Sequence, residues 1–229
     1  MIPLHDDNPT RIKPVVTIIL IVLCVLVFLW QSSLGPRFEQ ALFSLGAIPA
    51  VIFGSKLLPA QLEIVPPWAT VFTSMFMHGG WLHLIGNMLY LWIFGNNVED
   101  AMGHVRFVVF YILCGVIAFF AQSLPAPEST VPMVGASGAI SGVLGAYLLL
   151  YPRARVLVVI PLGLFLYTTR LAAGWVLAFW FILQLISSAL TATQQGGVAF
   201  GAHIGGFAGG MALIPFFKYK SQTLFTPRR

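Results

Sequence analysis

The chain has 229 residues, of which 58% are hydrophobic and only 8% are charged. Soluble domains carry about 25% charged residues, and a soluble fold of this size would expose much of its apolar surface to water. The composition therefore excludes a soluble protein and predicts a polytopic membrane protein. We expect the net charge of +5 to reflect the topology in a membrane, and we expect no nucleic-acid partner.

Apolar segments long enough to cross a bilayer, which takes about 20 residues, follow a polar cytoplasmic segment at residues 1–13. We expect six spans, at about 14–33, 81–98, 107–123, 135–151, 171–190 and 197–217. The first run has no convincing small-residue cleavage site, so it is interpreted as a retained span and not as a signal peptide. The predicted fold is thus an all-α membrane domain over residues 14–217, followed by a basic cytoplasmic tail at residues 218–229.

Two connecting segments are less regular. The connection at about 35–80 contains short amphipathic stretches and the Pro66-Pro67-Trp68 break, which predicts an interfacial loop with short helices. The segment 156–167 is apolar but short, and it contains Pro161 and Gly163. It is either an interfacial or re-entrant piece or the extended beginning of the fifth span.

The basic residues predict the orientation of the chain. With the N-terminus in the cytoplasm, ten of the twelve Lys and Arg residues fall on the cytoplasmic side, and only Arg37 and Lys56 fall outside. Cytoplasmic loops of membrane proteins carry the excess of positive charge. We therefore expect both termini in the cytoplasm, six spans, and a multi-pass protein of the cell membrane.

Polar side chains inside the predicted spans are candidates for function, because hydrocarbon cannot hydrate them. They are His83, Asn87, Ser137, Ser141, Gln184, Ser187, Ser188 and His203. In the predicted topology, three spans that run inward place His83, Ser137 and His203 near their outer ends. At 1.5 Å per residue, all three lie roughly 3–10 Å below the outer face.

This shared depth predicts a serine nucleophile. Ser137 needs a neighbouring base, and His203 is the base at its depth. No Asp or Glu lies inside a predicted span, so we expect a Ser–His pair and not a Ser–His–Asp triad. Glycines on the two spans, including Gly138, Gly142 and Gly206, predict a close helix–helix contact that brings the pair together.

Other polar residues have alternative interpretations. His83 and Asn87 share one helix face at i, i+4 spacing. They are either an interhelical hydrogen-bonded pair or donors to a developing oxyanion, which the backbone N–H of Ser137 would join. His78 lies just outside the span and is either an ordinary interfacial histidine or an additional oxyanion or water contact. Gln184, Ser187 and Ser188 are interpreted as packing or water-retaining groups.

Three motifs resemble the rhomboid family of intramembrane serine proteases. They are His78-Gly-Gly-Trp-Leu-His83-Leu-Ile-Gly-Asn87, Gly135-Ala-Ser137-Gly138 and Ala202-His203-Ile-Gly205-Gly206, and Gly95-Asn-Asn-Val-Glu99 with Gly103 also fits the family. The resemblance runs from about Trp68 to Gly210. It differs from some members in two respects: the long first loop has no Trp-Arg pair, and Ser141 replaces an aromatic residue that packs on the histidine.

The resemblance implies a minimal six-span protease with a water-filled cavity open to the outside. It implies Ser137 as nucleophile, His203 as general base and acid, and an oxyanion site of Asn87, His83 and the Ser137 backbone, with His78 as a further candidate. The implied substrates are single-span membrane proteins within the lipid bilayer, cut near their outer ends, and no metal or other cofactor is implied. The oligomeric state is not predicted.

Two alternative functions differ in class. A non-catalytic relative would bind membrane proteins and direct their traffic, but such proteins usually lack one of the two catalytic residues, and here both are present. A small transporter would be expected to show inverted repeats, broken helices and an intramembrane acid, and the sequence shows none of these.

Overall fold

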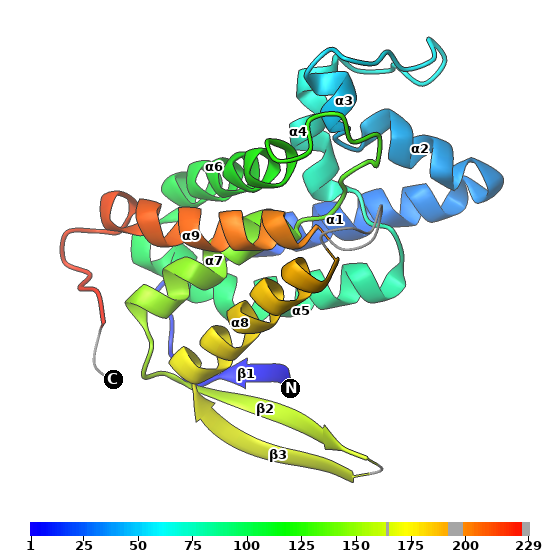
Figure 1. Cartoon of the computed structure of the whole chain (residues 1–229). Helices are drawn as coiled ribbons and strands as arrows, with labels where there is room; N and C mark the ends of the chain where they lie inside the picture. Colours follow the sequence, from blue (N-terminus) through cyan, green and yellow to red (C-terminus); the bar gives the residue numbers. More distant parts are fainter. Residues whose placement is uncertain (164, 192–198, 226–229) are drawn as a thin grey trace.

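A computed structural model describes residues 1–163, 165–191 and 199–225, with the side chain of residue 191 left out (Figure 1). This part of the chain is mostly helical. The long helices are α1 (Val15–Ser33), α5 (Trp81–Met102), α6 (His104–Ser123), α7 (Ser137–Leu150), α8 (Ala173–Thr191) and α9 (Phe200–Phe217). The strands are β1 (Ile2–Asp6), β2 (Arg155–Leu162) and β3 (Phe165–Ala172).

Four of the described helices are long and apolar enough to cross a membrane. They are α1, α6, α8 as far as Leu190, and α9. The helix α7 is apolar but shorter, whereas α5 is long but carries Asn87, Asn97 and Glu99 as buried polar residues. Length and composition alone therefore identify four spans among the described residues. They do not identify α5, which contains buried polar residues, or α7, which is short.

The short helix α7 lies in the middle of the bundle. Almost every residue from Ala139 to Tyr147 is buried, and α7 contacts α5, α6, α8 and α9. A helix that is apolar on all sides is expected in a protein core or in a membrane, and α7 is enclosed by other helices of the bundle. The helix begins at Ser137, after Gly135, whose φ of +123° favours glycine.

The contact between α7 and α9 is made by backbone on both sides. A Cβ atom on Gly206 would overlap the carbonyl group of Gly138, and one on Gly210 would overlap the carbonyl group of Gly142. Small residues allow this approach, which gives van der Waals contact that larger side chains would prevent. The glycines thus fix the distance between the helix that carries Ser137 and the helix that carries His203.

The expectation of an all-α fold is wrong at one end of the bundle, where an antiparallel sheet has the order β1-β2-β3. The described residues of the segment 156–167 are extended, but they belong to the antiparallel strands β2 and β3 and not to the beginning of the fifth helix. The side chains of β2 alternate, because Val156 and Val158 are fully buried whereas Arg155 is exposed. This period of two is the pattern of a half-buried strand.

The polar N-terminal segment forms β1, which pairs with β2 and completes the three-stranded sheet. In β1, Ile2 pairs with Val159 and Asp6 pairs with Val156. Asp6 is buried, and its Oδ2 accepts a 2.6 Å hydrogen bond from the hydroxyl of Tyr147 in α7. The sheet is therefore attached to the central helix.

A buried carboxylate joins α1 to α5 at the same end. The helix α5 continues to Met102, so Glu99 lies inside it and not in the turn predicted after residue 98. Glu99 accepts hydrogen bonds from the backbone N–H groups of Val16 and Thr17 at 2.9 and 2.8 Å, and from the Thr17 hydroxyl at 2.7 Å. These N–H groups have no acceptor within their own helix, so Glu99 caps the start of α1.

The connection at 35–80 forms short helices and 3₁₀ turns. They are α2 (Phe38–Leu45), α3 (Pro49–Ile52), α4 (Thr70–Thr73), and the turns Gly35–Arg37, Pro67–Ala69 and Ser74–Phe76. Figure 1 shows α2, α3 and α4 at the end of the bundle opposite the last turn of α9. The carbonyl oxygen of Ser74 accepts a 2.9 Å hydrogen bond from Gly135, so this region holds the chain just before α7.

Candidate active site

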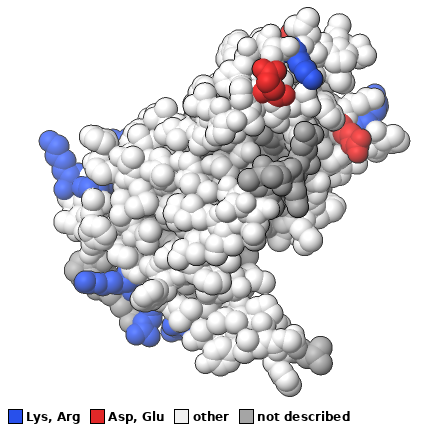
Figure 2. Space-filling view, in the orientation of Figure 1, with Lys and Arg blue, Asp and Glu red and all other residues white. Residues whose placement is uncertain are grey.

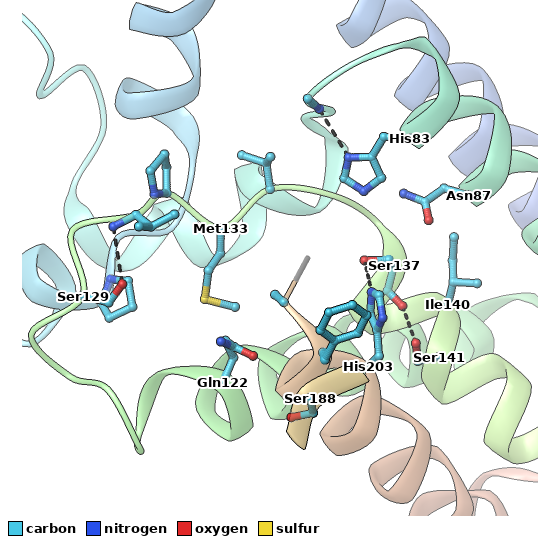
Figure 3. A pocket seen from close by; sticks show the side chains of 18 of the residues that line it. His83, Asn87, Gln122, Ser129, Met133, Ser137, Ile140, Ser141, Ser188 and His203 are labelled. Carbon is cyan, nitrogen blue, oxygen red and sulfur yellow. Dashed lines mark hydrogen bonds between the residues drawn. The ribbon is translucent and has the colours of Figure 1, made fainter. Parts of the chain in front are cut away.

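A cavity of about 1560 Å³ lies between α5, α7, α9 and the loop that precedes α7. Its lining includes His83, Asn87, Ser137, Ser141 and His203. Figure 3 shows these side chains around one space, on elements distant in sequence. Polar residues predicted to lie at one depth therefore share one cavity.

Ser137 and His203 are in direct contact. Ser137 is the first residue of α7, and His203 lies in the first turn of α9. The Ser137 Oγ atom is 2.8 Å from the Nε2 atom of His203, as the dashed line in Figure 3 shows. Because a neutral imidazole nitrogen with a lone pair can accept the hydroxyl proton, this geometry allows His203 to activate the serine.

His83 presents an N–H group toward the site. Its Nδ1 atom accepts a 3.3 Å hydrogen bond from the backbone N–H of Gly79. In the neutral ring the proton then resides on Nε2. A Cβ atom added to Gly135 would lie 2.7 Å from that Nε2 atom, which places the donor beside the chain two residues before Ser137.

Asn87 supplies a second donor one helical turn later. Its side chain is only 8% exposed, and within the described residues its Nδ2 atom has no hydrogen-bond partner. Figure 3 shows Asn87 and His83 on the face of α5 that is turned toward Ser137. A buried amide donor without an acceptor costs about 1–3 kcal/mol, so an acceptor that arrives with a substrate would be stabilised there.

His78 lies behind these residues. Its backbone is held by Gln31, whose Oε1 accepts from the His78 N–H at 3.0 Å and whose Nε2 donates to the His78 carbonyl at 3.2 Å. The His78 ring is fully buried, its centroid is 5.2 Å from that of His83, and its Nε2 atom has no partner within the described residues. Burial, with a smaller contribution from the adjacent His83, lowers the pKa of His78 to about 4. His78 therefore contacts a site residue and not the Ser137–His203 pair.

Two further polar residues, Ser141 and Ser188, line the cavity. Ser141 Oγ donates a 2.6 Å hydrogen bond to the carbonyl of Ser137 and does not support the His203 ring. Trp180 and Phe200 pack on that ring instead, with centroids 5.9 and 6.2 Å away.

Two contacts of the site were not predicted from the sequence. Gln184 was interpreted as a packing or water-retaining residue, but its Oε1 atom lies 2.8 Å from Nδ1 of His203. Gln122, at the end of α6, accepts a 3.2 Å hydrogen bond from the backbone N–H of Ala202. A Gln residue in an apolar helix is easily recognised in a sequence. Its hydrogen-bond partner, however, depends on how each helix is rotated about its own axis.

Comparisons with known proteins agree with this architecture. Residues 66–220 match the family model described as the Rhomboid domain. Rhomboid protease GluP of Bacillus subtilis is 35% identical over 137 residues, which cover 59% of this chain and 24% of that protein. Putative rhomboid protease YdcA of the same organism is 32% identical over 139 residues, 60% of this chain and 63% of that protein.

A eukaryotic relative is also similar. Rhomboid protein 1, mitochondrial, of Saccharomyces cerevisiae is 30% identical over 172 residues, which cover 72% of this chain and 47% of that protein. The matched regions thus span less than two thirds of the length of these curated relatives. The domain match over more than half of the chain and the several apolar helices show that this is an integral, multi-pass membrane protein of the rhomboid family.

Proposed function

We propose that the chain is an intramembrane serine endopeptidase that cleaves single-span membrane proteins near the outer membrane face. The observation that carries this proposal is the 2.8 Å contact between Ser137 Oγ and His203 Nε2 inside a rhomboid domain. In this proposal α1 and α5–α9 are six spans, both termini face the cytoplasm, and the protein resides in the cell membrane.

The first step is acylation of the serine. Ser137 Oγ attacks the carbonyl carbon of the scissile peptide while His203 Nε2 takes the hydroxyl proton. The resulting tetrahedral oxyanion accepts hydrogen bonds from Nε2–H of His83, from Nδ2 of Asn87 and from the backbone N–H of Ser137. That backbone N–H lies in the first turn of α7, where no intrahelical acceptor exists.

Collapse of the tetrahedral intermediate breaks the C–N bond. The imidazolium of His203 gives its proton to the departing amine, which leaves an ester between Ser137 and the acyl part of the substrate. Water then attacks this ester, with His203 again acting as base, and the second collapse frees the carboxylic acid and restores the serine. The cavity around Ser137, which is lined in part by polar side chains, would hold the water that this step consumes.

The distribution of charge supports the proposed orientation. Figure 2 shows most of the visible Lys and Arg side chains at the end of the molecule where α9 ends and β2 begins, although basic side chains also lie near α2 and α3. The Asp and Glu side chains visible on this face lie at the opposite end, near α2 and α3 (Figure 2). Because basic residues are retained in the cytoplasm, the start of α7, with Ser137, would face outward.

The decisive experiment replaces Ser137. The purified chain is reconstituted in liposomes with a single-span reporter, and cleavage and labelling by a fluorophosphonate probe are measured. Ser137→Ala is expected to abolish both, with the label on the unmodified protein mapped to Ser137 by mass spectrometry. Ser141→Ala is the matched control, one turn further along α7, and is expected to retain both. Cleavage that survives Ser137→Ala would refute the proposed nucleophile.

Substrate preference provides a second test. An intact helix keeps its carbonyl groups in i to i−4 hydrogen bonds, so the segment to be cut must unwind before Ser137 can attack it. We expect reporters with Gly or Pro near the outer end of the span to be cleaved faster than reporters with Leu only. Equal rates for the two reporters would contradict a need for local unwinding.

A further inference from the structure

The imidazole of His203 is held at both nitrogen atoms. Nε2 lies 2.8 Å from Ser137 Oγ, and Nδ1 lies 2.8 Å from Oε1 of Gln184 on α8. A neutral imidazole has one nitrogen that donates and one that accepts. The partner at Nδ1 therefore decides whether Nε2 is able to take a proton from the serine.

The orientation of the Gln184 amide is set by a third contact. Its Nε2 atom donates a 3.3 Å hydrogen bond to the carbonyl of Trp180, one turn earlier in α8. With the NH₂ group used in this way, Oε1 faces His203. A carbonyl oxygen only accepts, so Nδ1 of His203 must carry the hydrogen and Nε2 keeps its lone pair toward Ser137.

The opposite amide orientation would disable the base. An NH₂ group facing Nδ1 would donate to it and would place the ring hydrogen on Nε2, where it would point at Ser137 Oγ. The serine hydroxyl would then face an N–H group, which cannot accept the hydroxyl proton. The hydrogen bond from Gln184 to the Trp180 carbonyl thus favours the productive tautomer of His203.

The helix α8 also supports the ring by packing. The Trp180 ring packs on His203, as described above, and Phe181 stacks on Phe207 of α9 with a centroid distance of 4.5 Å. Phe207 lies one turn beyond His203 on α9. These aromatic contacts set the register of α8 against α9, and this register places Gln184 at Nδ1.

We propose that Gln184 is a positioning residue that holds His203 in the Nδ1–H tautomer, so that the chain works with the arrangement Ser137–His203–Gln184. This inference rests on the proposed protease function. Gln184 acts through His203 and does not touch the reacting atoms. It takes the orienting role that the third member plays in a Ser–His–Asp triad, but without a charge and from a separate helix.

The test uses the full chain in liposomes with three variants. Gln184→Met keeps the length of the side chain and removes the acceptor, whereas Gln184→Glu keeps an acceptor for Nδ1–H. Leu185→Met, beside Gln184 on α8, is the matched control, because Leu185 is 44% exposed and does not line the cavity. A general base contributes about 10²- to 10⁴-fold to a rate, and we expect Gln184→Met to lose part of that, with kcat lowered about 10- to 100-fold and KM unchanged.

Gln184→Glu is expected to recover most of kcat, and Leu185→Met is expected to match the unmodified protein. A kcat of Gln184→Met equal to that of the unmodified protein would overturn the proposal. A Gln184→Glu variant no more active than Gln184→Met would also overturn it. Thermal unfolding of each variant shows whether the fold is retained.

A spectroscopic measurement tests the inference independently of activity. In ¹⁵N-histidine NMR spectra of the protein, the His203 signals, assigned by their loss in His203→Ala, are expected to show the hydrogen on Nδ1 and to shift toward the Nε2–H form in Gln184→Met. Identical tautomer populations in the two proteins would refute the role of Gln184. An unmodified protein with neither cleavage nor Ser137 labelling would instead refute the proposed function, and the tautomer measurement would still decide the role of Gln184.

Discussion

Replacement of Gly210 by Ala tests whether the backbone contact between α7 and α9 sets the catalytic geometry. The added Cβ atom would lie 2.6 Å from Cα of Gly142 and closer still to its carbonyl group. Carbon atoms pack at about 3.5–4.0 Å, so the two helices must separate by about 1 Å. No side-chain rotation relieves the overlap, because the neighbouring atoms are backbone.

The expected loss of stability follows from two opposing effects. Overpacking of this kind costs about 1–3 kcal/mol, whereas replacing a helical glycine by alanine gains about 1 kcal/mol. Gly86→Ala is the control, since a Cβ atom at this position in α5 meets nothing within 4 Å. Both variants receive the gain in helix propensity, so the free energy of unfolding of Gly210→Ala should be about 1–3 kcal/mol below that of Gly86→Ala.

The same displacement should reduce activity. His203 lies two turns before Gly210 on α9, and a misplacement of about 1 Å in an active site costs about 100-fold in rate. Unfolding in mixed micelles of increasing sodium dodecyl sulfate content measures the stability, and reporter cleavage in liposomes measures kcat. If Gly210→Ala and Gly86→Ala changed the free energy of unfolding equally, the backbone contact would not be the constraint described here.

Three further predictions concern single polar residues. Asn87→Ala should lower kcat about 10²- to 10³-fold with little change in thermal unfolding, and an unchanged kcat would exclude Asn87 as an oxyanion donor. Burial raises the pKa of Asp6 to about 6, despite the lowering effect of its Tyr147 hydrogen bond. The folded state then binds this proton more tightly than the unfolded state, so the free energy of unfolding should fall by about 2 kcal/mol between pH 4 and pH 7. Asp6→Asn should remove this pH dependence, and a profile that matches the unmodified protein would contradict the assignment. Glu99→Ala should lower the free energy of unfolding by about 3 kcal/mol, because it leaves buried donors of Thr17 without an acceptor. Glu99→Gln should lose less, and equal losses for both variants would exclude the capping role.

The sequence predicts the starts of the helices well because most of them are long apolar runs. The predicted beginnings of the spans near residues 14, 81 and 107 fall within three residues of the starts of α1, α5 and α6. The candidate site residues can be picked out from the sequence because a polar side chain in an apolar run is conspicuous. The polar residues His83, Asn87, Ser137 and His203 line one cavity.

The missed features depend on contacts between distant segments. The run from Arg155 to Leu162 contains apolar residues throughout, so its alternation is weak, and its pairing with residues 2–6 has no local signal. Glu99 is visible in the sequence, but its role as a cap depends on the start of α1 lying against it. The partner of Gln184 likewise depends on the rotation of α8, which aromatic stacking sets.

The pairing of β1 with β2 has a consequence for how the protein is made. Ile2 pairs with Val159, so four long helices, α1, α5, α6 and α7, separate the two strands in the chain. A ribosome adds about 5–20 residues per second, so β1 waits on the order of ten seconds for its partner. During synthesis this strand is an unpaired edge, which is a template for association with other chains. Although β1 is synthesised before these four helices, it reaches its native pairing only after them.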